Sequence, residues 1–276
     1  MLTQQTSNPD LWNQVWNQSS QEKSEFWEWV ERDSNGVRGT KIQDYIRTHV
    51  GDISQLKTIE VGSGLGVFSF ILARLGAEVT LLDYSEQALS LAEECFQKNG
   101  LKAKFIRQDA LALDSNLYGR YDIAMSFGTV EHFRYPQRLQ MIETHLNCVR
   151  NGGAIVISAP NKAFLPHEIL KAYLQRKNKW ELGYEGAFNR REFFKIARQL
   201  QLSDSQVIGS AFLSDFQRYI QIYRSTNLFQ KIFGSNSSTS TNSQILQKSS
   251  WLDNYFGADL VLLGIKNQKM NYERKS

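Results

Sequence analysis

The segment "KTIEVGSGLG" at residues 57–66 constrains the fold of this chain more than any other. It reads as a short apolar strand over 57–61, followed by Gly62, Gly64 and Gly66 at the start of a helical pattern. Glycines at these positions let the backbone turn sharply and approach a ligand with no side chain in between. By itself such a loop also fits an ordinary tight turn. The segment therefore predicts a strand-to-helix bend and raises the question of its ligand.

Strands and helices alternate along most of the chain after this bend. Apolar runs predict strands at 57–61, 77–83, 103–109, 121–127, 154–160, 205–211 and 258–266. Helical patterns occupy 66–76, 85–99, 136–149 and 189–200, with a "RNGG" turn before the fifth strand. This spacing is typical of a parallel sheet that is covered by helices on both faces. In such a sheet, ligands bind beyond the carboxyl ends of the strands, where the strand order reverses.

Other segments interrupt or flank this alternation. Residues 10–50 look helical, and "SNSSTSTNS" at 235–243 is too polar to stay ordered, so we read it as a mobile loop. The expected organisation is an N-terminal helical segment at 1–50, a ligand-binding core at 51–161, an insertion at 162–188, a continuation of the core at 189–212, a helical insertion with the mobile loop at 213–257, and a final strand and tail at 258–276.

The spacing of the glycines separates two classes of cofactor. The dinucleotide pattern G-x-G-x-x-G would require glycine at position 67, where this chain has Val67. Glu60, near the end of the strand, would repel a pyrophosphate but would suit a cationic ligand. S-adenosylmethionine is such a ligand, because it carries a sulfonium and an ammonium and no phosphate.

Five motifs in order resemble those of the class I (Rossmann-like) S-adenosylmethionine-dependent methyltransferases, most closely their small-molecule "type 11" branch. They are "IEVGSGLG", "VTLLDYS", "FIRQDAL", "YDIAMSFGTVEHF" and "VRNGGAIVISAPN", spread over about residues 57–160. The resemblance implies an α/β fold with a Rossmann-like, seven-stranded, mostly parallel sheet, with lid insertions after strand five and between the last two strands. It also implies S-adenosyl-L-methionine as the cofactor, no metal, and cofactor contacts from Glu60, Gly62, Ser63, Gly64, Gly66, Asp83, Tyr84, Asp109, Ala110 and Phe127.

Two of these assignments also have a physical argument. Asp83 ends the second strand, and one carboxylate with two oxygens is well suited to hold both hydroxyls of a ribose. In the family, the residues matching Asp109 and the Ala110 amide read the adenine. Asp83 could instead begin a helix, although Ser85 is the better cap, and Asp109 could be a simple turn residue.

The chemistry needs few protein groups. Methyl transfer is an in-line displacement, so positioning dominates. A general base is needed only where the acceptor arrives protonated. His132, in "GTVEHF", is the candidate base, with a role in shaping the pocket floor as the alternative. We read Glu131 as a structural or cofactor-side residue and His167 as a second candidate base.

We expect substrate-binding residues in the insertion after strand five. Residues 162–198 hold nine Lys or Arg and four Glu, a net charge of +5, against +4 for the whole chain. The candidate substrate residues are Tyr135, His167, Tyr173, Trp180 and Tyr184. Aromatic walls with a nearby cation favour a small acceptor with a negative group. A solvated basic face explains the same charge equally well.

Two aromatic patterns leave several roles open. The stripe at 212–233 fits core packing, a homodimer contact or the far wall of the substrate pocket. Trp12 and Trp16, one helical turn apart, fit either a cap over the cofactor or an anchor for the N-terminal helix, and we favour the anchor.

Composition excludes several other classes. The two cysteines argue against a disulfide framework, and no apolar run approaches the roughly 20 residues of a membrane span. The polar N-terminus does not resemble a secretory signal, so we expect a cytoplasmic protein with no membrane partner. The chain has no N-P-P-Y or D-P-P-Y motif and no Pro-Cys nucleophile after strand four, which disfavours methylation of nucleic-acid bases.

The sequence thus predicts a methyltransferase that acts on an oxygen, hydroxyl or carboxylate, of a small molecule. The first alternative is an N-methyltransferase of a small molecule. Less favoured are a nucleic-acid methyltransferase, an NAD-dependent oxidoreductase and a non-enzymatic binding module. Titration with NAD and with S-adenosylmethionine separates the oxidoreductase from the methyltransferases.

Overall fold

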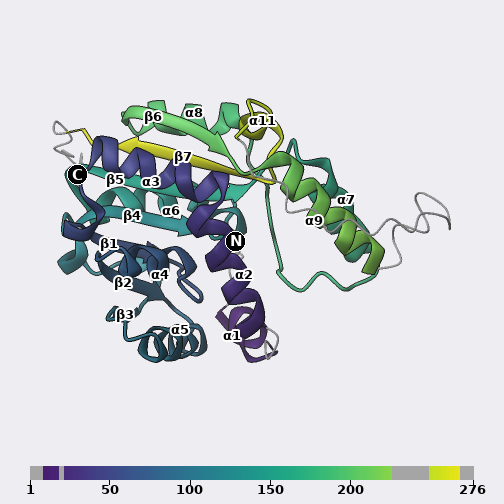
Figure 1. Cartoon of the computed structure of the whole chain (residues 1–276), viewed down its shortest axis with the longest axis horizontal. Coiled ribbons are helices and arrows are strands. Elements are labelled where there is room, and N and C mark those ends of the chain that lie inside the picture. The colour runs from purple at the N-terminus through teal and green to yellow at the C-terminus, as the bar shows by residue number, and fades with distance from the viewer. Residues whose placement is uncertain (1–8, 19–21, 226–248, 268–276) are drawn as a thin grey trace, which may run out of the picture.

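The protein is built on one seven-stranded sheet in the order β3-β2-β1-β4-β5-β7-β6 (Figure 1). The computed structural model describes residues 9–18, 22–225 and 249–267. The strands are β1 Lys57–Val61, β2 Glu78–Asp83, β3 Lys104–Arg107, β4 Tyr121–Phe127, β5 Val149–Pro160, β6 Ser203–Gly209 and β7 Asp259–Ile265. β7 runs antiparallel to both of its neighbours, and the remaining pairs are parallel. The predicted seven-stranded, mostly parallel sheet is confirmed.

Helices cover both faces of this sheet, and others lie beyond its edge. The described α-helices are α1 Pro9–Gln18, α2 Glu22–Asn35, α3 Val37–His49, α4 Val67–Arg74, α5 Glu86–Lys98, α6 Gln137–Cys148, α7 Leu165–Arg176, α8 Arg190–Gln199, α9 Phe212–Ser225 and α11 Asp253–Phe256. One apolar core packs α2, α3, α4 and α5 against side chains such as Ile123 and Met125 of β4. The other packs α6 and α8 against side chains such as Ala124 of β4 and Ile155 of β5. Because successive residues of a strand point to opposite faces, β4 contributes to both cores.

The helical pattern predicted at 10–50 corresponds to α1, α2 and α3. Two strands begin earlier than the sequence predicts. β6 is Ser203–Gly209 rather than 205–211. The fifth strand begins at Val149 rather than at 154, so the "RNGG" residues lie inside β5 and not in a turn. A Cβ on Gly153 would lie 2.7 Å from the carbonyl oxygen of Asp122, so glycine permits a close approach of two backbones there.

The topology places a binding edge at the carboxyl end of the sheet. The strand order reverses between β1 and β4, and the chain leaves β1 through the glycine loop into α4. Beyond this edge, α7 and α9 lie side by side and share a small apolar cluster around Leu170 and Tyr223 (Figure 1). Helix α1 contacts α5, the helix that follows β2.

Two further sequence predictions concern the remainder of the chain. The Ser/Thr/Asn tract at 235–243 lies outside the described residues. Among the helices that are described, none has the length and apolar character needed to cross a bilayer.

Candidate active site

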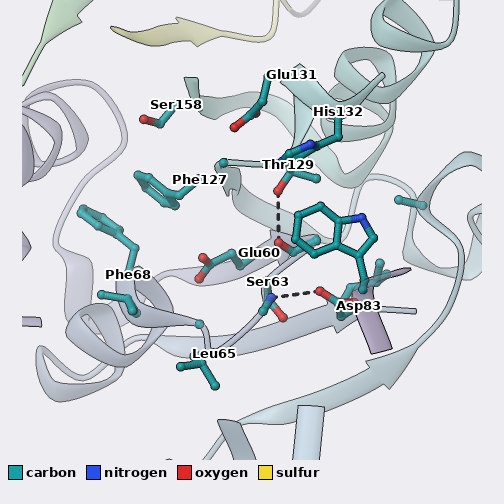
Figure 2. A pocket seen from close by; sticks show the side chains of 18 of the residues that line it. Glu60, Ser63, Leu65, Phe68, Asp83, Phe127, Thr129, Glu131, His132 and Ser158 are labelled. Carbon is teal, nitrogen blue, oxygen red and sulfur yellow. Dashed lines mark hydrogen bonds between the residues drawn. The ribbon is translucent and has the colours of Figure 1, made fainter. Parts of the chain in front are cut away.

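A cavity of about 470 Å³ opens at the carboxyl ends of β1, β2 and β4 (Figure 2). Its volume is within the range of roughly 300–1,000 Å³ that is usual for small-molecule sites. All ten residues predicted to contact the cofactor line this cavity, and so does His132. Figure 2 shows Ser63 and Asp83 on one side of the space and Glu131 and Ser158 on the other.

The glycine loop has the left-handed backbone that its sequence predicts. Gly62, Gly64 and Gly66 have φ of 66°, 51° and 66°. A Cβ on Gly62 would lie 2.4 Å from the Thr129 methyl carbon, and one on Gly66 would lie 2.2 Å from a methyl of Leu81. The Thr129 hydroxyl donates a hydrogen bond of 3.1 Å to the Gly62 carbonyl, which ties the loop after β4 to the loop after β1 (Figure 2). Side chains are excluded at these glycines, so the backbone itself can face a ligand.

Glu60 and Ser63 place polar groups at the cavity floor. One carboxylate oxygen of Glu60 accepts hydrogen bonds from the backbone amide and the hydroxyl of Ser69, at 2.9 and 2.6 Å. Burial raises the pKa of Glu60 to about 7, despite those two bonds. A cation in the cavity would favour the charged form of this side chain. Within the described part of the chain, the buried Ser63 hydroxyl has no hydrogen-bond partner.

Asp83 stands at the end of β2 and is almost fully buried. One of its oxygens accepts from the amide of Gly64 and the other from the amide of Ser85, both at 2.9 Å. Each carboxylate oxygen can accept a second hydrogen bond, so both remain available to a ligand. Asp109 caps its own turn through a bond of 2.9 Å from the Leu111 amide, and it borders the same cavity.

His132 is held in one tautomer by the backbone. Its Nδ1 lies 2.8 Å from the carbonyl oxygen of Tyr184, which can only accept, so Nδ1 carries the proton and Nε2 keeps a lone pair. Burial lowers the pKa of His132, with the Tyr184 contact acting in the opposite direction. The side chain is therefore neutral at neutral pH. The indole of Trp12 packs edge-on against the imidazole, with ring centroids 4.7 Å apart.

Glu131, beside His132, lies in surroundings that favour the neutral form of its carboxyl group. Its carboxyl group is buried and one of its oxygens has no hydrogen-bond partner among the described residues. Burial raises the pKa of Glu131 well above the ordinary value. The attraction of Arg138 acts in the opposite direction but is smaller, and the ion pair of Arg138 is with Glu192 at 3.2 Å.

The N-terminal helices supply a wall that the sequence only partly indicates. Trp12 and Trp16 both line the cavity, and Gly64 comes so close to the Trp16 ring that a Cβ would lie 2.7 Å from it. Asn13 also accepts a hydrogen bond of 2.8 Å from the Ser85 hydroxyl. These contacts favour a cap over the glycine loop, which is the alternative to the anchoring role that we preferred from the sequence.

An ion-pair network around Arg38 also lines the cavity. The Arg38 guanidinium donates to Asp33 at 2.6 Å, to Asp259 at 2.7 Å and to the Ser158 hydroxyl at 3.3 Å. These residues come from α2, α3, β5 and β7, with up to 221 positions between partners. No motif joins them in the sequence, so sequence reasoning missed them.

The candidate substrate residues lie elsewhere. None of Tyr135, His167, Tyr173, Trp180 and Tyr184 is among the side chains that line the cavity. Tyr135 is exposed and bonds Glu192 on the outer surface. Tyr173 joins the cluster between α7 and α9, and the Trp180 indole donates to the Gly183 carbonyl.

The other two candidates, Tyr184 and His167, contact residues that line the cavity. Tyr184 contributes its carbonyl oxygen to His132. His167 bonds Glu185 at 2.7 Å and Tyr219 at 2.8 Å. The residues that reach the cavity from these segments are Leu182, Glu185 and Arg218. Aromatic character therefore did not identify the residues of the cavity wall: Tyr135 is exposed, and Tyr173 packs between α7 and α9.

The fold and the cavity together define a class I (Rossmann-like) S-adenosylmethionine-dependent methyltransferase. A family model described as a methyltransferase domain matches residues 52–206, and the chain belongs to that family. Its cofactor is S-adenosylmethionine, and the cavity fits this molecule. The backbone at the glycines, the buried carboxyl of Glu60 and the Ser63 hydroxyl, which has no partner among the described residues, all line the site. The prediction of the class is confirmed, while assignment to the type 11 branch stays a prediction.

The chain is also similar in sequence to proteins that are named as methyltransferases. The chain is 26% identical over 174 residues to the ubiquinone biosynthesis O-methyltransferase of Pseudoalteromonas translucida, covering 62% of this chain and 72% of the relative. It is 28% identical over 177 residues to the Nitrosomonas europaea protein of the same name, covering 61% and 73%.

Solved structures share the fold. Magnesium protoporphyrin IX methyltransferase from Synechocystis PCC 6803, with bound S-adenosylhomocysteine, matches with a TM-score of 0.53 and 16% identity, over 83% of this chain and 82% of that one. A methyltransferase from Archaeoglobus fulgidus matches with a TM-score of 0.52 and 15% identity, over 87% and 99%.

Proposed function

We propose that this methyltransferase acts on a hydroxyl oxygen of a small molecule and that His132 is its general base. The observation that carries the proposal is the fixed tautomer of His132 at the cavity wall, with Nδ1 bonded to the Tyr184 carbonyl at 2.8 Å. A neutral imidazole with a free Nε2 lone pair can accept the proton of a hydroxyl acceptor.

The type of acceptor follows from what the chemistry requires. S-adenosylmethionine supplies a methyl group that is already activated, so the chain has to align the acceptor and exclude water. An acceptor that is already an anion, such as a carboxylate, needs no base. A hydroxyl loses a proton during the reaction, and a neutral histidine beside it is then useful. The state of His132 therefore supports a hydroxyl ahead of a carboxylate.

Two further observations support an oxygen acceptor of small size. The relatives found by sequence comparison are named O-methyltransferases of ubiquinone biosynthesis. The cavity of about 470 Å³ also has to hold the cofactor, which leaves room for only a modest acceptor. The contacts predicted for Glu60, Ser63, Asp83, Asp109 and the glycine loop belong to this proposal as the cofactor-binding set.

Matched acceptors test the element that is methylated. Purified protein is incubated with S-adenosylmethionine and catechol, 1,2-diaminobenzene or benzoate, and the products are identified by mass spectrometry. We expect a methyl ether from catechol and little product from the other two. Methylation of the diamine alone would establish N-methylation instead, and a methyl ester from benzoate would remove the need for a base.

A variant of His132 tests the base. His132→Gln should lower kcat with catechol by about two orders of magnitude, while the affinity for S-adenosylhomocysteine stays unchanged. The rise of kcat/KM with pH that a neutral base produces below its pKa should also disappear. His49→Gln, in α3 and away from the cavity, is the matched control. A loss of less than about tenfold in His132→Gln would leave the imidazole only a shaping role.

A further inference from the structure

We propose that Arg218 binds a carboxylate on the acceptor, so that the enzyme selects hydroxylated small molecules that carry this anionic group. Arg218 belongs to α9, the helix between β6 and β7, and it lines the same cavity as His132 and the glycine loop. The proposal rests on the proposed function, because it assigns the substrate class of that same site.

The guanidinium of Arg218 lacks a hydrogen-bond partner in the described structure. Its Nε is buried and bonds no other described residue, and no carboxylate of the described residues lies within 4.0 Å of its nitrogens. Its ring neighbour is Tyr219, with the guanidinium carbon 5.6 Å from the ring centroid. Asp215 attracts it from farther away, but an oxygen of Asp215 is already bonded to the Ser210 hydroxyl and the Ala258 amide.

The other cations around the cavity are paired. Arg38 is held between Asp33 and Asp259, and Arg32 lies 3.5 Å from Asp33. Lys171 bonds Glu168 at 2.7 Å and the cavity-lining Glu185 at 3.2 Å, so the charge of Glu185 is also balanced. Among the described residues that line the cavity, Arg218 is thus the arginine whose positive charge has no carboxylate beside it.

The basic segment at 162–198 does not supply the cation for an anionic acceptor, as the sequence had suggested. None of its nine Lys and Arg lines the cavity. Lys171 is used in ion pairs, and Arg190 donates to the carbonyls of Val207 and Asn254. The basic segment is therefore mainly a surface and packing feature, and the candidate for anion binding comes from α9.

A carboxylate is the group that best completes this site. A buried N–H without an acceptor is unfavourable, and water or a ligand oxygen removes that cost. The planar guanidinium matches a carboxylate through two parallel hydrogen bonds, which is stronger and more specific than a single bond. A ligand that brings a carboxylate to Arg218 therefore gains affinity that its neutral analogue lacks.

The position of Arg218 points to the acceptor rather than to the cofactor. Its neighbour Tyr219 bonds His167, and His167 bonds Glu185, which follows the Tyr184 carbonyl that holds His132. Arg218 is thus connected to the wall that carries the proposed base. The glycine loop and Asp83 belong to the opposite wall, where the nucleoside is expected (Figure 2).

A pair of probes that differ only in charge tests the proposal. The protein, saturated with S-adenosylhomocysteine, is titrated by calorimetry with 3,4-dihydroxybenzoate and with the neutral 3,4-dihydroxybenzamide. We expect the wild type to bind the benzoate at least about tenfold more tightly. Arg218→Gln should lose this preference, Arg218→Lys should keep part of it, and Arg224→Gln, an exposed position of the same helix, should keep all of it.

Three results would overturn the proposal: equal affinity of the wild type for the two probes, no detectable binding of the benzoate, or a preference that survives in Arg218→Gln. A second pair of ligands tests whether Arg218 binds the carboxylate of the cofactor instead. They are S-adenosylhomocysteine and 5′-methylthioadenosine, which lacks the amino-acid portion. If Arg218→Gln weakens S-adenosylhomocysteine but not 5′-methylthioadenosine, Arg218 binds the cofactor and the proposal is wrong. Because these are binding measurements, an absence of methyl-ether product would reject the proposed function alone.

Discussion

The carboxylate of Asp83 accepts a hydrogen bond of 2.9 Å from the backbone amide of Gly64, which joins the end of β2 to the glycine loop that follows β1 (Figure 2). The same side chain therefore organises the loop and offers its remaining lone pairs to the cavity. A mutation at this position changes both the protein's own contacts and those to a ligand. The experiment has to separate the two effects.

Asp83→Asn should weaken S-adenosylhomocysteine binding by at least about a hundredfold, because an amide offers one acceptor where the ribose hydroxyls need two, and hydrogen bonds to charged groups contribute about 1.5–3 kcal/mol each. Calorimetry measures the affinity. Asp114→Asn is the matched control, because Asp114 also accepts from the amide two residues on, at 2.8 Å, but lies outside the cavity. Unchanged affinity in Asp83→Asn would reject the ribose assignment.

Glu60→Gln should weaken S-adenosylmethionine more than S-adenosylhomocysteine. The first ligand carries a sulfonium that the second lacks, and Glu60 is the buried carboxyl at the cavity floor. We expect a loss of about tenfold for the sulfonium ligand, equal to about 1.4 kcal/mol. The affinity for the neutral-sulfur product is the internal control. Equal losses for the two ligands would mean that Glu60 only supports the loop through Ser69.

The titration of Glu60 gives the same assignment a second readout. Its pKa of about 7 means that the ligand-free protein holds a proton there in part of the population at neutral pH. A bound cation favours the ionised carboxylate, so wild-type protein should release protons on binding S-adenosylmethionine at pH 7. Calorimetry in two buffers with different ionisation enthalpies measures this release, which Glu60→Gln should lack.

Gly64→Ala should displace Trp16 and weaken cofactor binding, because its Cβ would lie 2.7 Å from the indole ring. Gly100→Ala is the matched control. Gly100 has φ of 65° against 51° for Gly64, so both variants carry a left-handed strain of about 1–2 kcal/mol, but no atom lies within 4 Å of a Cβ at Gly100. Urea unfolding should show a destabilisation of both variants, larger for Gly64→Ala, and only Gly64→Ala should lose affinity for S-adenosylhomocysteine. Similar affinities would mean that Trp16 does not cap the site.

The sequence predicted the sheet well because the information there is local. The strands β1 and β4 begin and end where the apolar runs do. Helix α5 begins after Ser85, whose hydroxyl accepts from the Ala88 amide as a cap residue should. Strand β5 was placed five residues too late, because "NGG" is an ordinary turn signal. In the structure, Gly153 allows a close backbone approach inside the strand.

The walls of the site were harder to predict because they depend on contacts between distant segments. Arg38 meets Asp259 across 221 positions, and Arg218 reaches the cavity through the packing of α9 on α7. Residue type was also misleading: Trp180 and Tyr173 look like ligand-binding residues, but their rings pack within the insertion. The residues predicted to bind the cofactor carry a motif in the sequence, whereas Arg38 and Arg218 carry none.

His145 should make the protein less stable as the pH falls from 6.5 towards 4. Its side chain is fully buried in α6, with Nδ1 bonded to the Met141 carbonyl, and burial lowers its pKa from 6.5 to about 4. Between these values the unfolded chain binds a proton that the folded protein does not, so acidification favours unfolding. The full difference corresponds to about 3 kcal/mol. Glu60 acts in the opposite direction, because its raised pKa makes the folded state the better proton binder.

The contribution of His145 is therefore isolated as a difference between two proteins. His145→Leu removes the titrating group and a buried Nε2 that has no partner among the described residues. Urea unfolding at pH 7 and at pH 4.5 should show a smaller loss of unfolding free energy for His145→Leu than for the wild type, while the contribution of Glu60 is common to both. An equal loss in the two proteins would mean that His145 binds its proton as readily in the folded state as in the unfolded chain, despite its buried position in α6.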